Sequence, residues 1–285
     1  MVAFWPGERE PEYNGKKLSE WIERCWEFGL DDSQNTEAQN IVQTIGTNGL
    51  PSLLKWARQG VPVWQIRAAE WCQKFHVYWL GHPVWARARR NYHAWAALRL
   101  LGPKATSAVP EVSRIAMDSG SYEVMGHAVI FLSESGPDGV PPLLQIIAQG
   151  TGERRIKAIV HIADMPDLGT NASVVVAVLM KCLDENDESV AACAANSLGR
   201  LGRETKKVVP ALIGLLHDQR PAVSTSAWEA LGMLADNRAA VPDLQRAVPE
   251  LATAKEDPIP KVRECATNAL VKIAPEVLTN GVKGF

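Results

Sequence analysis

The chain has 285 residues, of which 46% are hydrophobic and 22% are charged, and its formal net charge is -2. These proportions are typical of a folded soluble protein, and the small net charge argues against nucleic-acid binding over the whole surface. No apolar run reaches the roughly 18 residues that a membrane helix needs, and Met1–Pro6 is too short for a signal peptide. We expect a cytoplasmic protein for the chain as it stands, and a periplasmic or membrane-anchored protein if an upstream segment has been removed.

Residues 1–48 are predicted to form an N-terminal repeat of two helices. The first helix runs Leu18–Phe28 and the second runs Thr36–Ile45. Side chains three and four residues apart share one face of a helix, and the first helix has apolar side chains at that spacing. These side chains are Leu18, Trp21, Ile22 and Cys25.

Residues 49–104 are predicted to form a second repeat that contains an inserted helix. Two long helical patterns, Val63–Leu80 and Val84–Leu101, stand where one is expected, and Gly81-His82-Pro83 separates them. Aromatic side chains recur along both patterns, and nine of the ten tryptophans lie in the first 95 residues. From residue 50 to residue 109 there are nine lysines and arginines but one acid, Glu70, so this block has a net charge of +8.

This aromatic and basic block has two interpretations. It is either a site for an anionic partner or a cap in which an extra helix and its aromatic side chains seal the end of a repeat stack. Burial of the tryptophans between residues 56 and 95 separates the two, because a cap buries them and a site exposes several together. The candidate partner-binding residues of the block are Arg67, Trp71, Lys74, Trp85, Arg87, Arg90 and Trp95.

Residues 105–275 repeat one helical phrase every 31 to 40 residues. In its clearest copy, Val209-Pro210 opens a helix with leucines at helical spacing, and a second helix rich in small residues follows from Val223. A period of about 20 to 50 residues is the signature of a solenoid. The copies begin near Val109, Val140, Ser173, Val208 and Val248, and residues 276–285 form a predicted tail.

Two segments, Asp184–Gly202 and Pro260–Leu270, carry the most regular copies of this phrase. On these residues the sequence resembles the HEAT-repeat family, and Glu10–Trp21 is similar to the entry segment of uncharacterised bacterial HEAT-repeat proteins. The resemblance implies an all-α fold: a right-handed α-α superhelix of the HEAT/armadillo type with about seven helical hairpins, forming one solenoid over residues 1–285. HEAT motifs identify the architecture of a protein but give little information about its activity.

The sequence lacks the residue patterns that carry catalysis. None of its six histidines is followed by Glu, the ligand pair used by HEAT-like iron hydroxylases, and no phosphate-binding glycine loop or GxSxG motif occurs. The five cysteines form no CxxC pair, and their helical positions are typical of small packing residues. We therefore expect no catalytic, cofactor-binding or metal-binding residue, and no enzyme.

The expected function is that of a non-enzymatic scaffold for a protein or peptide. The partner would lie on the concave face made by the second helix of each repeat, on the inserted block, or on both. Asn196, Glu229 and Asn268 occupy one column of that face and are further candidate partner-binding residues, and such a neutral-to-acidic column suits a DNA backbone poorly. Two alternatives use the basic block at residues 50–109: nucleic-acid binding, as in a DNA-glycosylase-like repair protein, and association with an anionic membrane surface.

Overall fold

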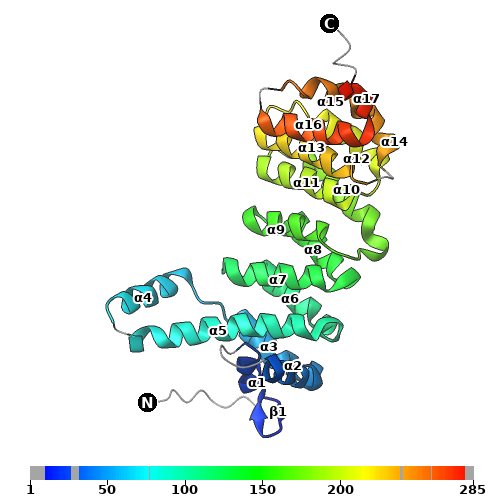
Figure 1. Ribbon diagram of the computed structural model, residues 1–285. Helices are drawn as coiled ribbons and strands as arrows, with labels where there is room; N and C mark the ends of the chain where they lie inside the picture. Colours follow the sequence, from blue (N-terminus) through cyan, green and yellow to red (C-terminus); the bar gives the residue numbers. More distant parts are fainter. Residues whose placement is uncertain (1–9, 27–31, 77, 238–239, 258, 280–285) are drawn as a thin grey trace. The chain divides into compact units, whose positions relative to one another are not determined.

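The computed structural model describes residues 10–26, 32–76, 78–237, 240–257 and 259–279 (Figure 1). Contacts within the chain divide it into two compact units, Met1–Pro142 and Leu143–Phe285. Over these described ranges, no helix combines the length and the apolar character needed to cross a bilayer.

The described elements are helices except for one small strand pair, β1 (Glu12–Tyr13) and β2 (Lys16–Lys17). Neighbouring helices pair as hairpins along most of the described chain, so the predicted all-α class and its succession of helical hairpins are confirmed. The helices of the first unit are α1 (Leu18–Cys25), α2 (Asp32–Ile45), α3 (Leu50–Arg58), α4 (Val63–Lys74), α5 (Tyr78–Leu101), α6 (Val109–Asp118) and α7 (Tyr122–Glu134).

Hairpins in the first unit form where the apolar spacing predicts them. α1 packs on α2 and buries the four apolar side chains of its predicted face. α6 likewise packs on α7, and Pro110 lies in its first turn, where the missing N–H removes no helical hydrogen bond. Glycines in the left-handed conformation, Gly46, Gly102 and Gly136, follow α2, α5 and α7 and start the short turns to the next hairpin.

The second hairpin of this unit is α3 with α5, and α4 is the inserted helix. α4 ends at Lys74, so the predicted break at Gly81-His82-Pro83 is wrong. The chain instead turns at His76, which adopts a left-handed conformation with φ of 63°. Pro83 lies within the first two turns of α5, where it removes its own helical hydrogen bond without ending the helix.

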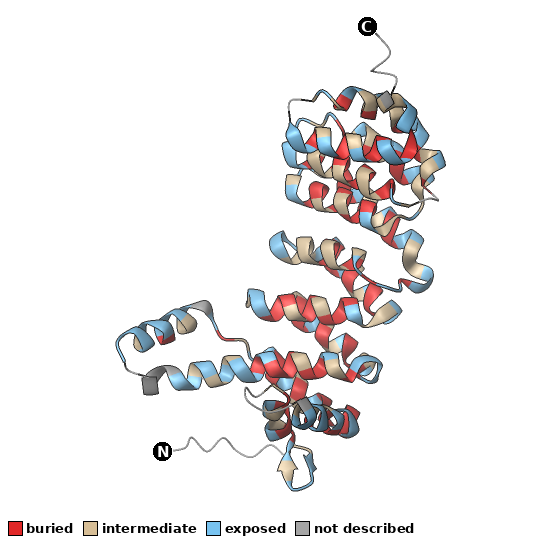
Figure 2. Cartoon of the chain, viewed as in Figure 1, coloured by how far each residue is buried: buried red, intermediate tan, exposed pale blue. Residues whose placement is uncertain are grey.

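The two halves of α5 have different surroundings. Asn91 is buried, and its Nδ2 donates to the carbonyl oxygens of Trp56 at 3.0 Å and Ala57 at 2.7 Å, which fixes the second half of α5 on the end of α3. The first half continues beyond that stack and pairs with α4 (Figure 1). Exposed residues predominate there, whereas buried residues predominate after Asn91 (Figure 2). We call α4 and the first half of α5, residues 63–90, the arm.

The second unit repeats the hairpin more regularly. Its second helices lie side by side, with α9 against α11, α11 against α13 and α13 against α16. Part of the predicted tail is helical as α17, and residues 280–285 lie outside the described ranges. The helices are α8 (Val140–Gln149), which begins at the unit boundary, α9 (Gly152–Ala163), α10 (Ala172–Leu183), α11 (Glu188–Leu201), α12 (Thr205–Gly214), α13 (Pro221–Leu234), α14 (Val241–Leu244), α15 (Val248–Ala254), α16 (Pro260–Ile273) and α17 (Pro275–Thr279).

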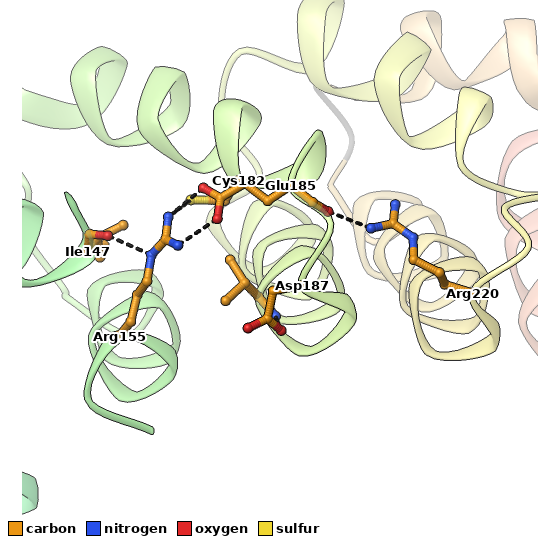
Figure 3. A network of polar contacts seen from close by, with 7 residues as sticks. Ile147, Arg155, Cys182, Glu185, Asp187 and Arg220 are labelled. Atoms are coloured by element: carbon orange, nitrogen blue, oxygen red, sulfur yellow. Dashed lines mark hydrogen bonds and ion pairs between the residues drawn. The ribbon is translucent and has the colours of Figure 1, made fainter. Parts of the chain in front are cut away.

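A polar network joins three successive hairpins of the second unit (Figure 3). Arg155 of α9 donates from Nε to the carbonyl oxygen of Ile147 at 2.6 Å and from Nη1 to Oε2 of Glu185 at 2.5 Å. The carbonyl oxygen of Glu185 accepts from Nη1 of Arg220, which precedes α13, at 2.6 Å. Asp187, between these arginines, caps α11 by accepting from the amides of Ser189 and Val190. The network therefore holds the turns of neighbouring hairpins in register.

Candidate partner-binding site

The tryptophans of the aromatic block divide into a buried pair and an exposed set. Trp56 is 4% exposed and Trp95 is 1% exposed, because both lie where α3 and α5 pack together. In the arm, Trp64 is 68% exposed, Trp71 is 61% exposed and Trp85 is 40% exposed. The cap interpretation therefore fits the two tryptophans at the α3–α5 junction, and the arm has the exposure that a site requires. The side chain of Trp79 lies outside the described part of the chain.

On α4 the exposed aromatic side chains share one face. Trp64 and Trp71 stand seven residues apart in α4, and Phe75, the C-cap residue of α4, follows four residues later. A rotation of about 100° per residue places the three within a narrow stripe. The rings of Trp71 and Phe75 have centroids 4.5 Å apart. Ala69, on the opposite side, is buried against the arm's other helix. The structure thus turns the aromatic stripe of α4 toward solvent.

Several cations of the block make contacts within the first unit. Arg58 pairs with Glu111, Arg99 pairs with Glu134, and Arg90 lies over the ring of Trp56 at 5.9 Å. Arg90, a predicted partner-binding residue, therefore also stabilises the arm's base through a cation–π contact. The exposed cations of the arm also include Arg67 and Lys74 on α4 and Arg87 and Arg89 on α5.

The base of the arm is an aromatic and imidazole cluster. Trp95 stacks on His127 with centroids 6.1 Å apart, and His93 stacks on Trp26 at 5.5 Å. Burial lowers the pKa of His93, and the charge of Arg89 lowers it further. A neutral imidazole packs more readily in such a cluster. These contacts hold the second half of α5, from which the arm extends.

Sequence reasoning missed four exposed residues in the arm or directly beside it as site candidates. Three are aromatic, and their exposed fractions are 68% for Trp64, 54% for Phe75 and 51% for Tyr92. The fourth is Arg89, which shares a helical face with Trp85 and Tyr92 because the three stand four and three residues apart. The seven-residue spacing of Trp64 and Trp71 was a signal for a shared face, but spacing does not tell which face is buried.

A pocket of about 830 Å³ lies at the foot of the arm, between the α3–α4 connection and the α6–α7 turn. Val61, Pro62 and Ile115 give it apolar walls. Its two arginines, Arg58 and Arg114, both pair with Glu111, whose single carboxylate offsets one of their two positive charges. The other lining residues are Gly60, Asp118, Ser119, Gly120, Ser121 and Tyr122.

The predicted polar column lies in the second unit, on three adjacent helices. Asn196 of α11 donates from Nδ2 to Oε2 of Glu229 on α13 at 3.5 Å. Asn268 of α16 is exposed on the next helix. The structure therefore brings Asn196 and Glu229 together. Because they hydrogen-bond to each other, each has fewer donors or acceptors left for a partner.

Four of the cysteine thiols are shifted toward their protonated form. Burial raises the pKa of the Cys25 thiol to about 12, and burial also raises the pKa values of Cys182, Cys193 and Cys265. A thiol that keeps its proton is a weak nucleophile and a weak metal ligand. Over the described ranges, no three His, Cys, Asp or Glu side chains gather as metal ligands.

Comparison with known proteins identifies the repeats. A family model for HEAT repeats matches residues 176–248, from within α10 to the start of α15. No curated protein matched the sequence. The HEAT-repeat resemblance expected from the sequence is confirmed.

Solved structures of engineered and designed proteins are also similar. An engineered protein of the Northeast Structural Genomics Consortium is 17% identical, with 90% of this chain and 96% of that chain covered and a TM-score of 0.45. A designed armadillo repeat protein is 17% identical, with coverage of 90% and 100% and a TM-score of 0.43. Another, solved in complex with the peptide (KR)4, is 16% identical, with coverage of 90% and 100% and a TM-score of 0.46.

Proposed function

We propose that this HEAT-repeat chain is a scaffold that binds another protein through its arm. The observation that carries the proposal is the concentration of exposed large hydrophobic side chains there. Half of those found across the described residues lie in the arm or directly beside it, between residues 64 and 92. Exposed apolar groups gathered in one place are typical of an interaction surface, whereas single ones are ordinary. Four of these five belong to the arm, namely Trp64, Trp71, Phe75 and Trp85, and the fifth, Tyr92, follows two residues after it.

The composition of the arm favours a protein over a nucleic acid or a membrane. Tryptophan, tyrosine and arginine are the residues enriched in the energetically dominant parts of protein interfaces, where lysine is depleted. The exposed cations of the arm include several arginines, among them Arg67, Arg87 and Arg89, but the segment has one lysine, Lys74. A surface that binds phosphate or lipid headgroups by charge alone would use lysine as readily.

The arm is a better candidate than the polar column of the second unit. Asn196 and Glu229 already share a hydrogen bond, so a partner would have to compete with it. Burial of tryptophan on binding supplies more free energy than exchange of one polar contact for another. The proposed role requires no catalytic residue.

Replacement of Trp64 and Trp71 by alanine tests the proposal. Each tryptophan at the centre of an interface contributes about 2 kcal/mol or more, so each change should weaken binding about 30-fold. The partner is recovered on immobilised wild-type protein, purified, and titrated against the wild type and the double variant. Tyr122→Ala is the matched control, because Tyr122 is an aromatic residue of the same unit that is 56% exposed outside the arm.

Two further titrations separate the alternatives. Wild-type protein is titrated at low salt with a DNA duplex and with phosphatidylserine vesicles. The proposal expects neither to bind and expects the protein partner to distinguish the double variant from Tyr122→Ala. It fails if the double variant keeps full affinity for every recovered partner, or if DNA or vesicles bind and Arg67→Ala with Arg87→Ala abolishes that binding. Unchanged circular dichroism and melting temperature confirm that the exposed substitutions leave the fold intact.

A further inference from the structure

We infer that the bound segment is an amphipathic α-helix flanked by acidic residues, which lies along the solvent-facing side of α4. The inference rests on the proposed function and specifies the partner's chemistry. Its basis is that two lines of side chains, one aromatic and one cationic, run parallel along α4 with the same spacing.

The aromatic line has the period of a helix interface. Trp64 and Trp71 stand seven residues apart, and Phe75 follows four residues later, on the next turn. Seven-residue spacing is the repeat by which two helices keep one seam in contact. α4 spans 12 residues, which at about 1.5 Å per residue gives roughly 18 Å of surface. This length accommodates three successive turns of a partner helix.

The cationic line follows the same period at an offset of three residues. Arg67 and Lys74 are also seven residues apart, and both are exposed. At about 100° per residue they project beside the aromatic stripe, whereas Glu70 projects farther from it. The positions that flank an apolar seam are those at which charge selects the partner. Two cations on this edge therefore select glutamate or aspartate on the facing helix.

The inner side of α4 is already occupied. Ala69 is 2% exposed, and α4 packs on α5, so α4 is held in place while its aromatic side has no cover within the described chain. A helix added there would complete a group of three helices, in which an apolar stripe lies in a groove between aromatic side chains. A second copy of this arm is a poor occupant, because it would oppose arginine and lysine with arginine and lysine.

Three synthetic helices test the inference by fluorescence anisotropy. The first carries four heptads with leucine on the seam and glutamate at the flanking positions. The second has lysine at those flanking positions. The third has the composition of the first but with a proline in each of the two central heptads, which prevents continuous helix. Each is titrated against the full-length wild type, Trp64→Ala/Trp71→Ala, Arg67→Glu/Lys74→Glu and the control Tyr122→Ala.

The expected pattern has three parts. Wild type and Tyr122→Ala bind the glutamate helix at least tenfold more tightly than the lysine helix or the proline-containing peptide. The tryptophan variant loses at least tenfold in affinity for the glutamate helix. The charge-reversed variant prefers the lysine helix. Equal binding of the glutamate and lysine helices, undiminished binding of the proline-containing peptide, or no binding of any probe overturns the inference.

Failure of the inference is distinguishable from failure of the proposed function. A natural partner that still depends on Trp64 and Trp71, together with no preference among the synthetic helices, leaves the arm as the binding site and removes the helical acidic partner. A partner indifferent to both tryptophans removes the arm itself.

Discussion

At the scale of single residues, Arg220 shows how one side chain links two hairpins. Its guanidinium donates from Nε to Oδ1 of Asp218 at 2.9 Å and from Nη2 to Oδ2 at 2.8 Å, and its backbone amide also donates to Oδ1. The remaining nitrogen reaches the carbonyl oxygen of Glu185 in the preceding hairpin at 2.6 Å. Hydrogen bonds to the charged form lower the pKa of Asp218 to about 2.

This pair predicts a defined response to acid. The pKa of Asp218 is lower in the folded chain than its ordinary value of 3.8, so the unfolded chain binds more protons between those values. The pair's contribution to stability is therefore complete above about pH 4 and disappears as the pH falls through about 2. Urea denaturation at successive pH values should show that Asp218→Asn lowers the midpoint most at neutral pH and converges on the wild type near pH 2. A constant offset across the whole range contradicts the assignment. Arg220→Lys, which keeps the charge but loses the planar fork, should lie between the two.

At the scale of elements, two glycines at the same place in the repeat meet different surroundings. Gly199 of α11 and Gly232 of α13 each follow a buried leucine in the same repeat phrase. A Cβ atom on Gly199 would stand 2.5 Å from the Cα of Ala230, whereas a Cβ on Gly232 would meet its nearest atom, the carbonyl oxygen of Cys265, at 4.0 Å. α11 therefore approaches α13 more closely than α13 approaches α16 at these positions.

The two alanine substitutions should act in opposite directions. Gly199→Ala forces two packed helices apart and should lower the free energy of unfolding by about 1–3 kcal/mol. Gly232→Ala adds a methyl group in ordinary contact and removes the entropic cost of a helical glycine, so it should raise that free energy by about 0.5–1 kcal/mol. Urea denaturation followed by circular dichroism measures both. Destabilisation of equal size at the two positions would show that the close contact between α11 and α13 does not determine the effect of Gly199→Ala.

The arm marks the limit of what the sequence predicts at this scale. The regular hairpins follow from apolar spacing and from glycine and proline at the turns, because each such signal acts within a few residues. The orientation of α4 depends on a distant contact, since Asn91 fixes α5 on the end of α3 and α5 in turn holds Ala69 of α4. The aromatic spacing alone is equally compatible with a buried stripe. The same limit explains the misplaced break, because the local signal of Pro83 does not end a helix that begins only five residues earlier.

At the scale of the whole molecule, the hairpins within each unit pack mainly on their neighbours along the chain. Because these contacts are local, the fold class could be predicted from the sequence. The candidate site could not be predicted in the same way, because it lies on the inserted helix, which departs from the repeat. The locality of the contacts also determines how far the effect of a destabilising substitution extends along the chain. Stability in such a chain is approximately a sum of repeat and nearest-neighbour contributions.

Leu212→Ala, compared with Leu98→Ala, tests this locality. Both leucines are fully buried, Leu212 in α12 and Leu98 in α5, and removal of either side chain should cost about 2–5 kcal/mol. α12 packs on α13 and α14, so hydrogen exchange measured by mass spectrometry should accelerate in these three helices and stay unchanged in α3 and α5. Leu98→Ala should give the reverse, with faster exchange in α3, α5 and α7 and none in α12 or α13. Uniform acceleration along the chain in either variant would mean that the repeats unfold as one cooperative body. The neighbour-by-neighbour account would then be wrong, and the arm could not be altered without effect on the distant hairpins.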